Sequence, residues 1–111
     1  MTPAMFEVEK KEGCAIDDTE LNLQCPSFLS IYVQDVTYGR KIGVKKICGE
    51  KHGNPLLTCQ AWNVLSTVIT ECQGKWNCSL AVKPSLAKPK LDPKCDKLKK
   101  ELKAEYSCCK Y

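Results

Sequence analysis

The segment CQGKWNC, residues 72–78, joins two sequence patterns that decide the fold. Before it, apolar residues recur every three or four positions, which is the period of an amphipathic helix. We expect this helix over about residues 59–73, with Thr58 as its N-cap and Gly74 as its left-handed stop. After the segment, residues 79–82 (SLAV) indicate a short strand. The predicted apolar face of the helix consists of Ala61, Trp62, Val64, Leu65, Val68, Ile69 and Cys72.

Two strands are expected before the helix. Residues 21–25 (LNLQC) alternate between apolar and polar, as a half-buried strand does. In the next apolar stretch, residues 31–38, the apolar positions change from odd to even numbers. Because successive side chains of a strand point to opposite faces, this change predicts a β-bulge near Gln34-Asp35. We expect Gly39 to end that strand.

The C-terminal third contains one irregular segment and one ambiguous segment. Three prolines interrupt residues 83–95, which predicts an irregular loop. Residues 97–105 are rich in strong helix formers, with two leucines four positions apart. Residues 102–108 also alternate, as a strand that ends at a cysteine would. The two patterns leave both helix and strand open for this segment.

Composition restricts the class of protein. Nine of the 111 residues are cysteine, and no apolar run approaches the roughly 18 residues that a membrane span needs. A small chain rich in cysteine is typical of a secreted domain held by disulfides, since its core alone gives limited stability. Residues 1–13 lack the apolar core of a signal peptide, so we expect a mature domain whose signal has been removed. Membrane proteins, multidomain enzymes and fibrous repeats are excluded.

Residues that would carry catalysis or bind a metal are scarce. The single histidine, His52, lies beside Gly53-Asn54-Pro55 in an expected turn, where a catalytic base is rarely held. The cysteines form no CxxC pair of the kind that binds zinc, and no glycine-rich loop matches a phosphate site. We therefore expect no enzyme activity, no bound metal and no cofactor.

The net charge of +4 is unevenly distributed. Residues 83–111 contain nine lysines and four acidic residues, and this excess either attracts acidic glycans or simply keeps the surface soluble. Arg40 is the only arginine. Because base-specific contacts to nucleic acid rely largely on arginine, we expect no nucleic-acid partner.

Four short motifs follow one another along the chain: Tyr38-Gly39-Arg40, the C-x-G-K-x-x-C loop at 72–78, Asp92-Pro93-Lys94-Cys95 and Tyr106-Ser107-Cys108. Together with eight of the cysteines, they resemble the sea-urchin egg lectin type (SUEL) family, also called the rhamnose- or galactose-binding lectin domain. The resemblance covers about residues 14–108. It implies an α/β (α+β) fold, namely a compact five-stranded antiparallel β-sandwich with one main helix and four disulfides.

The resemblance also implies domain limits, a closing strand and a disulfide pairing. It places the lectin domain at residues 14–109, after an N-terminal extension (1–13) and before a C-terminal tail (110–111). It favours a strand over residues 101–108. The implied disulfides are Cys14–Cys48, Cys25–Cys108, Cys59–Cys95 and Cys72–Cys78.

Cys109 is left over by this pairing. An odd cysteine in a secreted protein suggests an interchain bond or a capped thiol. Adjacent residues of a strand point to opposite faces, so we expect Cys109 to be exposed if Cys108 turns inward. A disulfide-linked homodimer through Cys109 and a monomer with a capped thiol both stay open.

In sugar-binding members of the family, the pocket lies between the end of the YGR strand and the DPC loop. Carried over by position, the implied ligand-binding residues are Thr37, Tyr38, Asp92 and Lys100. Asp92 would accept hydrogen bonds from vicinal hydroxyls, Lys100 would donate one, and Tyr38 would supply an aromatic wall. We expect Arg40 to make a structural ion pair instead of contacting sugar.

The chain departs from the family pattern at this pocket. Ala15 replaces an acid that follows the first cysteine, and Thr37 replaces a common asparagine. Lys94 interrupts the DPC motif, and Glu101 alters the entry to the last strand. Two functions therefore stay open. One is a secreted or extracellular lectin for rhamnose- or galactose-like glycans. The other is a cell-adhesion or guidance-receptor module of the same fold, with a degenerate pocket, that binds protein, heparin or another glycosaminoglycan.

Overall fold

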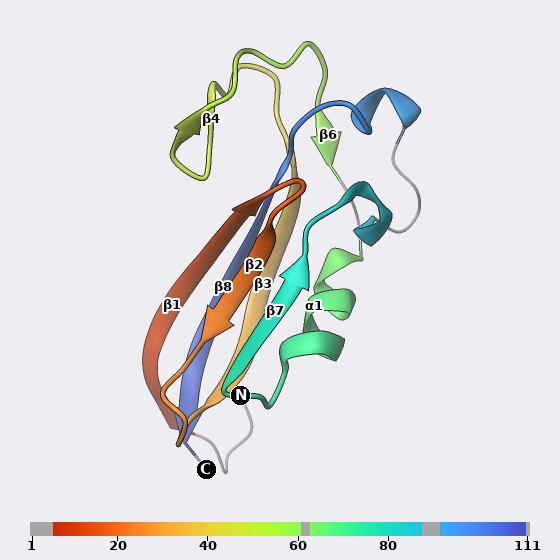
Figure 1. The fold of residues 1–111 in the computed structure, drawn as a ribbon. Coiled ribbons are helices and arrows are strands. Elements are labelled where there is room, and N and C mark those ends of the chain that lie inside the picture. The colour runs from red at the N-terminus through yellow and green to blue at the C-terminus, as the bar shows by residue number, and fades with distance from the viewer. Residues whose placement is uncertain (1–5, 61–62, 88–91, 111) are drawn as a thin grey trace.

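The fold is built on an antiparallel sheet of four strands. The structure is a computed structural model that describes residues 6–60, 63–87 and 92–110. The strand order across the sheet is β1-β8-β3-β6, so that β8, the last strand of the chain, lies between β1 and β3 (Figure 1). The strands are β1 (Phe6–Ile16), β3 (Ser30–Arg40), β6 (Cys59–Gln60) and β8 (Glu101–Lys110).

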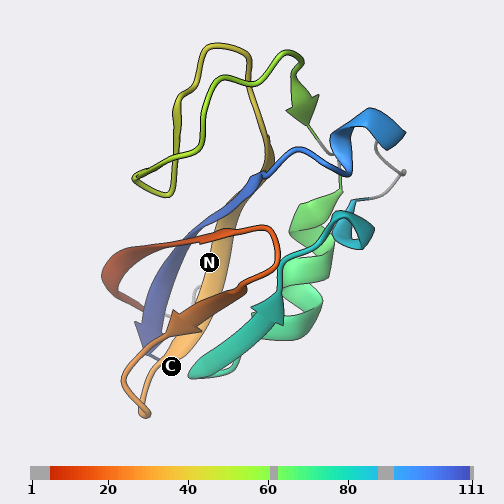
Figure 2. The same cartoon turned by 45° about the horizontal axis from the view of Figure 1, so that its top comes forward.

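A second layer covers one face of this sheet (Figures 1 and 2). It contains the two-stranded antiparallel pair β2 and β7, and helix α1, which packs against β3 and β7. The pair β4 and β5 forms a small hairpin in the long connection between β3 and β6. The remaining elements are β2 (Glu20–Gln24), β4 (Lys46–Ile47), β5 (Glu50–Lys51), α1 (Val64–Cys72), β7 (Asn77–Ala81) and the 3-10 turns η1 (Pro84–Leu86) and η2 (Pro93–Cys95).

The predicted fold class is confirmed, because the domain is rich in β-strands, has one α-helix and contains four disulfides. The described residues form eight strands, compared with the five expected. Strands β4, β5 and β6 have two residues each, which is too short to produce an alternating pattern in the sequence. No helix in the described part of the chain is long and apolar enough to cross a bilayer.

Residues 6–13, which the sequence analysis placed in an extension, form most of strand β1. This strand pairs with β8 from Phe6 opposite Lys110 to Ile16 opposite Glu101. Side chains of residues 6–12 are exposed, so the stretch shows no alternation that would reveal a strand. Its place in the fold comes from backbone pairing with β8, and its charged side chains suit the edge of a sheet.

The β-bulge predicted in the middle of β3 is confirmed. The pairing register between β3 and β8 shifts between Val33 and Asp35. The shift keeps Ile31 and Val33 on the buried face before it and Tyr38 on the same face after it. The change of parity in the sequence therefore reports the bulge directly.

Strand β8 settles the ambiguity of the C-terminal segment in favour of the strand. Its buried face carries Leu102, Ala104, Tyr106 and Cys108. Pairing on both sides, with β1 and with β3, satisfies the backbone of β8 in a way that a helix at this position would not allow. Tertiary pairing thus overrides the helix propensity of the lysine-rich stretch.

Helix α1 is shorter than predicted. It begins at Val64, because residues 59–60 are held extended in β6 by pairing with the end of β3. Asn63, with a left-handed φ of 66°, is the N-cap. Thr58 is not a cap, since its hydroxyl accepts a hydrogen bond from the Ile42 amide. Of the predicted apolar face, Val64, Val68 and Cys72 are buried, Ile69 is half-buried against the core, and Leu65 is 37% exposed. Ala61 and Trp62 lie outside the described residues.

The disulfides have the pairing that the family resemblance implies: Cys14–Cys48, Cys25–Cys108, Cys59–Cys95 and Cys72–Cys78. The bridge between Cys25 and Cys108 spans 83 positions and ties the end of β2 to β8. In the chain-entropy view, loops of this size stabilise a domain by roughly 3–5 kcal/mol each. Such bridges compensate for the small core of a domain of this length.

Candidate functional site

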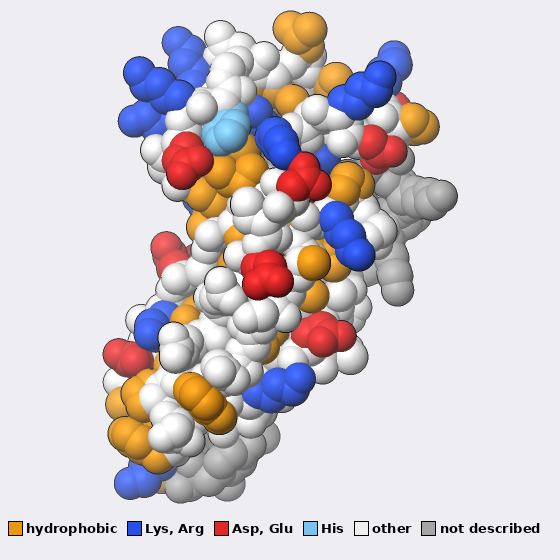
Figure 3. Space-filling model, in the orientation of Figure 1, with side chains coloured by type: hydrophobic (Ala, Val, Ile, Leu, Met, Phe, Trp, Pro, Cys, Tyr) orange, Lys and Arg blue, Asp and Glu red, His pale blue; other side chains and the backbone are white. Residues whose placement is uncertain are grey.

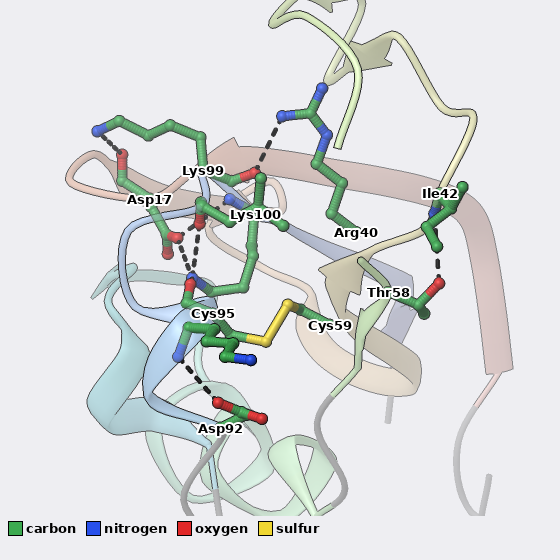
Figure 4. The surroundings of a disulfide bond; sticks show 11 residues. Asp17, Arg40, Ile42, Thr58, Cys59, Asp92, Cys95, Lys99 and Lys100 are labelled. Carbon is green, nitrogen blue, oxygen red and sulfur yellow. Dashed lines mark hydrogen bonds and ion pairs between the residues drawn. A yellow bond between two sulfur atoms is a disulfide. The ribbon is translucent and has the colours of Figure 1, made fainter. Parts of the chain in front are cut away.

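A buried polar cluster lies where β3 ends and β8 begins. It contains Asp17, Tyr38 and Lys100, which are 4%, 1% and 0% exposed. Lys100 Nζ lies 2.8 Å from Asp17 Oδ2, and the Tyr38 hydroxyl donates a hydrogen bond to Asp17 Oδ1. Figure 4 shows Asp17 and Lys100 facing each other. The cluster joins the turn after β1 to the start of β8.

Each polar atom of this cluster has a partner. Lys100 Nζ also donates to the carbonyl oxygens of Cys95 and Leu98, at 2.7 and 2.8 Å, and its backbone amide donates to Asp17 Oδ2. The same ammonium lies 5.8 Å from the centre of the Tyr38 ring. Burial raises the pKa of the Tyr38 hydroxyl well above its usual value, and the hydrogen bond to Asp17 raises it further. These groups hold the fold together from inside.

Tyr38 and Lys100 therefore do not face solvent as the predicted sugar-contacting residues would. Their polar atoms are engaged by Asp17, a residue that the sequence analysis missed. One signal was present: the alternation of β8 extends back to Lys100, which predicts an inward-pointing ammonium. A buried lysine requires an acidic or carbonyl partner. The sequence does not show which acid supplies it, because the contact spans 83 positions.

Asp92, the predicted sugar-binding carboxylate, is exposed but stands outside this cluster. Its Oδ1 accepts a hydrogen bond from the Lys94 amide at 2.9 Å and caps turn η2. In Figure 4 the Cys59–Cys95 bridge lies between Asp92 and Asp17. The structure thus does not bring Asp92 together with Tyr38 or Lys100 in an open pocket.

Thr37, the fourth predicted residue, is exposed and lines a cleft of about 270 Å³. This cleft, called the sheet-end cleft below, lies between the ends of β3 and β8 and the connection that carries β4. Its polar wall includes the Thr37 hydroxyl, the Gln60 amide and the Glu101 carboxylate. Its apolar wall includes Val44 and Ile47.

Glu101 is the acidic group of the sheet-end cleft. Its Oε2 accepts a hydrogen bond from the Cys48 amide at 2.7 Å, and its Oε1 lies 3.6 Å from Lys103 Nζ. The Sγ atoms of Cys14 and Cys48 also lie nearby. Because these two sulfurs are bonded to each other, they offer no thiolate to a metal. Glu101 remains as an acceptor for ligand hydroxyls.

The close approach of β6 explains why a glycine, Gly39, precedes Arg40 at the end of β3. A Cβ atom at this position would lie 2.0 Å from the Cys59 carbonyl oxygen, because the paired strand β6 comes close to the end of β3 here. Its φ of +152° also disfavours other residues. The glycine therefore allows β6 and Gln60 to approach the cleft.

Arg40 differs from the expectation of a structural ion pair. The residue is 4% exposed, and its guanidinium donates hydrogen bonds to the carbonyl oxygens of Val44, His52, Gly53 and Lys99. Among the described residues it forms no ion pair. Arg40 thus ties the β4–β5 connection to the sheet through neutral acceptors.

Cys109 is buried, so the expectation that it is exposed is wrong. Its exposed fraction is 0%, like that of Cys108 on the opposite face of β8. Burial raises the pKa of the Cys109 thiol. Cys109 lies outside the four bridges, but its burial does not support the disulfide-linked homodimer.

Comparison with known proteins places most of the chain in one family. Residues 23–108 match the family model described as "D-galactoside/L-rhamnose binding SUEL lectin domain". The matched region includes three of the four disulfides, all of β3 and α1, and β8 as far as Cys108. The match extends over the walls of the sheet-end cleft.

Similar curated proteins are also found. The chain is 34% identical over 79 residues to human (Homo sapiens) "Protein eva-1 homolog C" and 35% identical over 82 residues to the mouse (Mus musculus) protein of that name. The matched regions cover 68% and 71% of this chain. They cover only 17% and 18% of the relatives, so the chain spans less than a fifth of their length.

Proposed function

Because the chain belongs to the SUEL lectin domain family, we propose that it is a carbohydrate-binding domain of an extracellular protein and that sugar binds in the sheet-end cleft. It acts as a binding domain and not as an enzyme. The observation that carries the proposal is the composition of this cleft, which combines hydroxyl, amide and carboxylate groups with an apolar wall.

The chemistry of the cleft suits a hexose. Glu101 accepts hydrogen bonds from ring hydroxyls, and charge-assisted bonds of this kind are among the stronger ones. Thr37 and Gln60 add neutral donors and acceptors. Val44 and Ile47 offer carbon surface to the apolar face of a sugar ring. Tyr38 also lines the cleft, although it is only 1% exposed, and with Lys100 it belongs to the buried cluster that fixes the ends of β3 and β8.

The test is Glu101→Gln, measured by binding to a glycan array and by titration with the glycans that bind. The amide keeps an oxygen to accept from the Cys48 amide, but it loses the negative charge. We expect affinity to fall about tenfold or more, as for the loss of a charge-assisted bond. The measurement compares wild type and variant on the same array.

Glu105→Gln is the matched control, because Glu105 lies on the same strand and face but does not line the sheet-end cleft. It should bind glycans as wild type does. Asp92→Asn distinguishes the two possible sites of sugar binding, the sheet-end cleft and the turn that carries Asp92. Loss of binding in Asp92→Asn with none in Glu101→Gln would move the sugar to the DPC turn and contradict the cleft.

A second candidate function is favoured by the β4–β5 hairpin. Lys46 and Lys51 lie directly opposite each other across the two strands, and Lys45 joins them around a hollow of about 280 Å³. Like charges placed opposite in a sheet are destabilising unless an anion compensates for them. This surface suits a sulfated glycosaminoglycan, which is among the ligands of the second function that the sequence left open.

A further inference from the structure

A dense group of basic residues lies beside the sheet-end cleft. Residues 40–53 contain five basic residues and one acidic residue, a net charge of +4, which equals that of the whole chain. Arg40 and Lys41 line the cleft itself. Lys and Arg side chains gather at this end of the molecule, over the β4 region (Figure 3). A ligand in the cleft therefore experiences a positive potential.

Arg40 is the unusual member of this group. A buried cation is costly unless a negative charge compensates for it. Here the four acceptors of the guanidinium are neutral carbonyl oxygens, and its buried Nε donates to none of the described residues. The acid that lines the cleft, Glu101, is engaged by Lys103 and by the Cys48 amide. Arg40 therefore lacks an acidic partner within the described part of the chain.

From these observations we infer that the sheet-end cleft selects a carboxylate-bearing sugar, such as a uronic acid, over its neutral counterpart. This inference rests on the proposed function, since it names the class of sugar that the same cleft takes. The sugar carboxylate lies toward Lys41 and supplies the negative charge that Arg40 lacks. Its hydroxyls are left to Glu101, Thr37 and Gln60, and its ring lies against Val44 and Ile47.

Two other groups shape this selectivity. Lys41 is exposed, so it can follow the ligand and contact the carboxylate directly. Lys103 Nζ lies 3.6 Å from Glu101 Oε1, so these two charges largely neutralise each other. The net positive charge of the cleft then comes from Arg40 and Lys41. An acidic sugar thus gains a favourable interaction that a neutral sugar of the same shape does not.

The experiment compares methyl β-D-galacturonide with methyl β-D-galactoside, which differ only in the carboxylate. Arg40 is the only arginine in the chain, so its Nε–H gives one identifiable cross-peak in a ¹H–¹⁵N spectrum. We expect the galacturonide to shift this peak and to bind at least about tenfold more tightly than the galactoside, as a charge-assisted contact would. Lys41→Gln should remove most of this preference.

Lys75→Gln is the matched control, because it removes the same charge from a turn beside Ile31, near the opposite end of β3. It should leave the preference for the acidic sugar intact. Equal affinity for both sugars, with shifts in cleft residues, would overturn the inference and leave the proposed function in place. Absence of shifts with either sugar would overturn both. Loss of the preference in Lys75→Gln as well as in Lys41→Gln would reduce the effect to net charge and would also overturn the inference.

Discussion

Asp17 and Lys100 form a buried ion pair that joins two turns at the same end of the sheet. The pair stabilises the domain only as a complete unit, because each charge is hidden from water. Asp17 also accepts from the Tyr38 hydroxyl and from the Lys100 amide. Removal of one member thus leaves several polar groups without partners in the core.

Replacing Lys100 with methionine tests this role. Lys100→Met leaves the Asp17 carboxylate buried without its counter-ion, so we expect the free energy of unfolding to fall by about 3–5 kcal/mol. The double variant Asp17→Asn/Lys100→Met should recover part of the loss. Urea unfolding of both variants measures the effect. Lys97→Met, at an exposed lysine, is the control and should lose little stability. A loss in Lys100→Met that is as small as in this control would contradict the stabilising role of the buried ion pair.

The hydroxyl of Tyr38 makes stability depend on pH in the alkaline range. The folded domain raises the pKa of Tyr38, whereas a tyrosine of the unfolded chain titrates near pH 10. The contribution of Tyr38 is therefore complete below about pH 10 and falls as the pH rises above it, by up to about 1.4 kcal/mol per pH unit. Unfolding in urea between pH 9 and about pH 11 should show a steeper loss in wild type than in Tyr38→Phe. Parallel curves for the two proteins would exclude this role of the hydroxyl.

At the scale of elements, the antiparallel pairing of β6 with the end of β3 positions Gln60 at the sheet-end cleft. Strand β6 pairs with β3 through only two residues, Gly39 and Arg40. The Cys59–Cys95 bridge holds the other side of β6 to turn η2. This short element therefore depends on a glycine that leaves room for it.

Gly39→Ala should disrupt the pairing of β6 with β3. The new Cβ would lie 2.0 Å from the Cys59 carbonyl oxygen, so the two backbones must separate. We expect the free energy of unfolding to fall by roughly 3 kcal/mol or more, as for a strained backbone position combined with a clash. Gly49→Ala is a matched control, because Gly49 also has a positive φ but has no atom within 4 Å of its Cβ position. It should lose only about 1 kcal/mol. Similar losses in the two variants would show that the φ angle, and not the close approach of β6, determines the loss of stability.

The elements also show which features of the fold could be predicted from the sequence. The bulge in β3 was predictable, because the parity of apolar residues changes where the register shifts. The start of α1 was not, since the apolar period continues through residues that the β3 pairing holds extended. Strand β1 was missed because its side chains from 6 to 12 are exposed.

The candidate site was harder to predict than the fold for a related reason. The residue types at the strand ends single out Tyr38 and Lys100 as candidate site residues. They do not show whether these side chains face a ligand or one another. That distinction depends on Asp17, which meets them only after the sheet has closed. The cleft likewise depends on the course of the β4–β5 connection, whose two-residue strands leave no pattern in the sequence.

At the scale of the whole molecule, some basic side chains of the described residues form ion pairs with acids and others lie beside further basic side chains. Lys99 lies 2.5 Å from Asp18, and this contact lowers the pKa of the Asp18 carboxyl. Lys46 and Lys51 face each other instead of facing an acid. We therefore propose the hairpin lysines as the surface on which to test anion binding, in addition to the lysine-rich C-terminal segment.

The hairpin predicts how heparin should bind if a sulfated glycosaminoglycan is a ligand. The Debye screening length falls from about 10 Å at 0.1 M salt to about 3 Å at 1 M. Affinity for immobilised heparin should therefore fall steeply as the salt concentration rises. The double variant Lys46→Gln/Lys51→Gln should weaken binding and flatten the salt dependence, while unfolding in urea stays close to wild type. Lys10→Gln/Lys11→Gln removes the same charge from β1, the edge strand of the four-stranded sheet and not part of the β4–β5 hairpin. This variant should change heparin binding less than the hairpin variant does. If both double variants lose heparin equally, net charge and not the hairpin governs the interaction. If neither loses it, the hairpin is not the binding surface, and its opposed lysines are then a strain that the domain tolerates without a ligand.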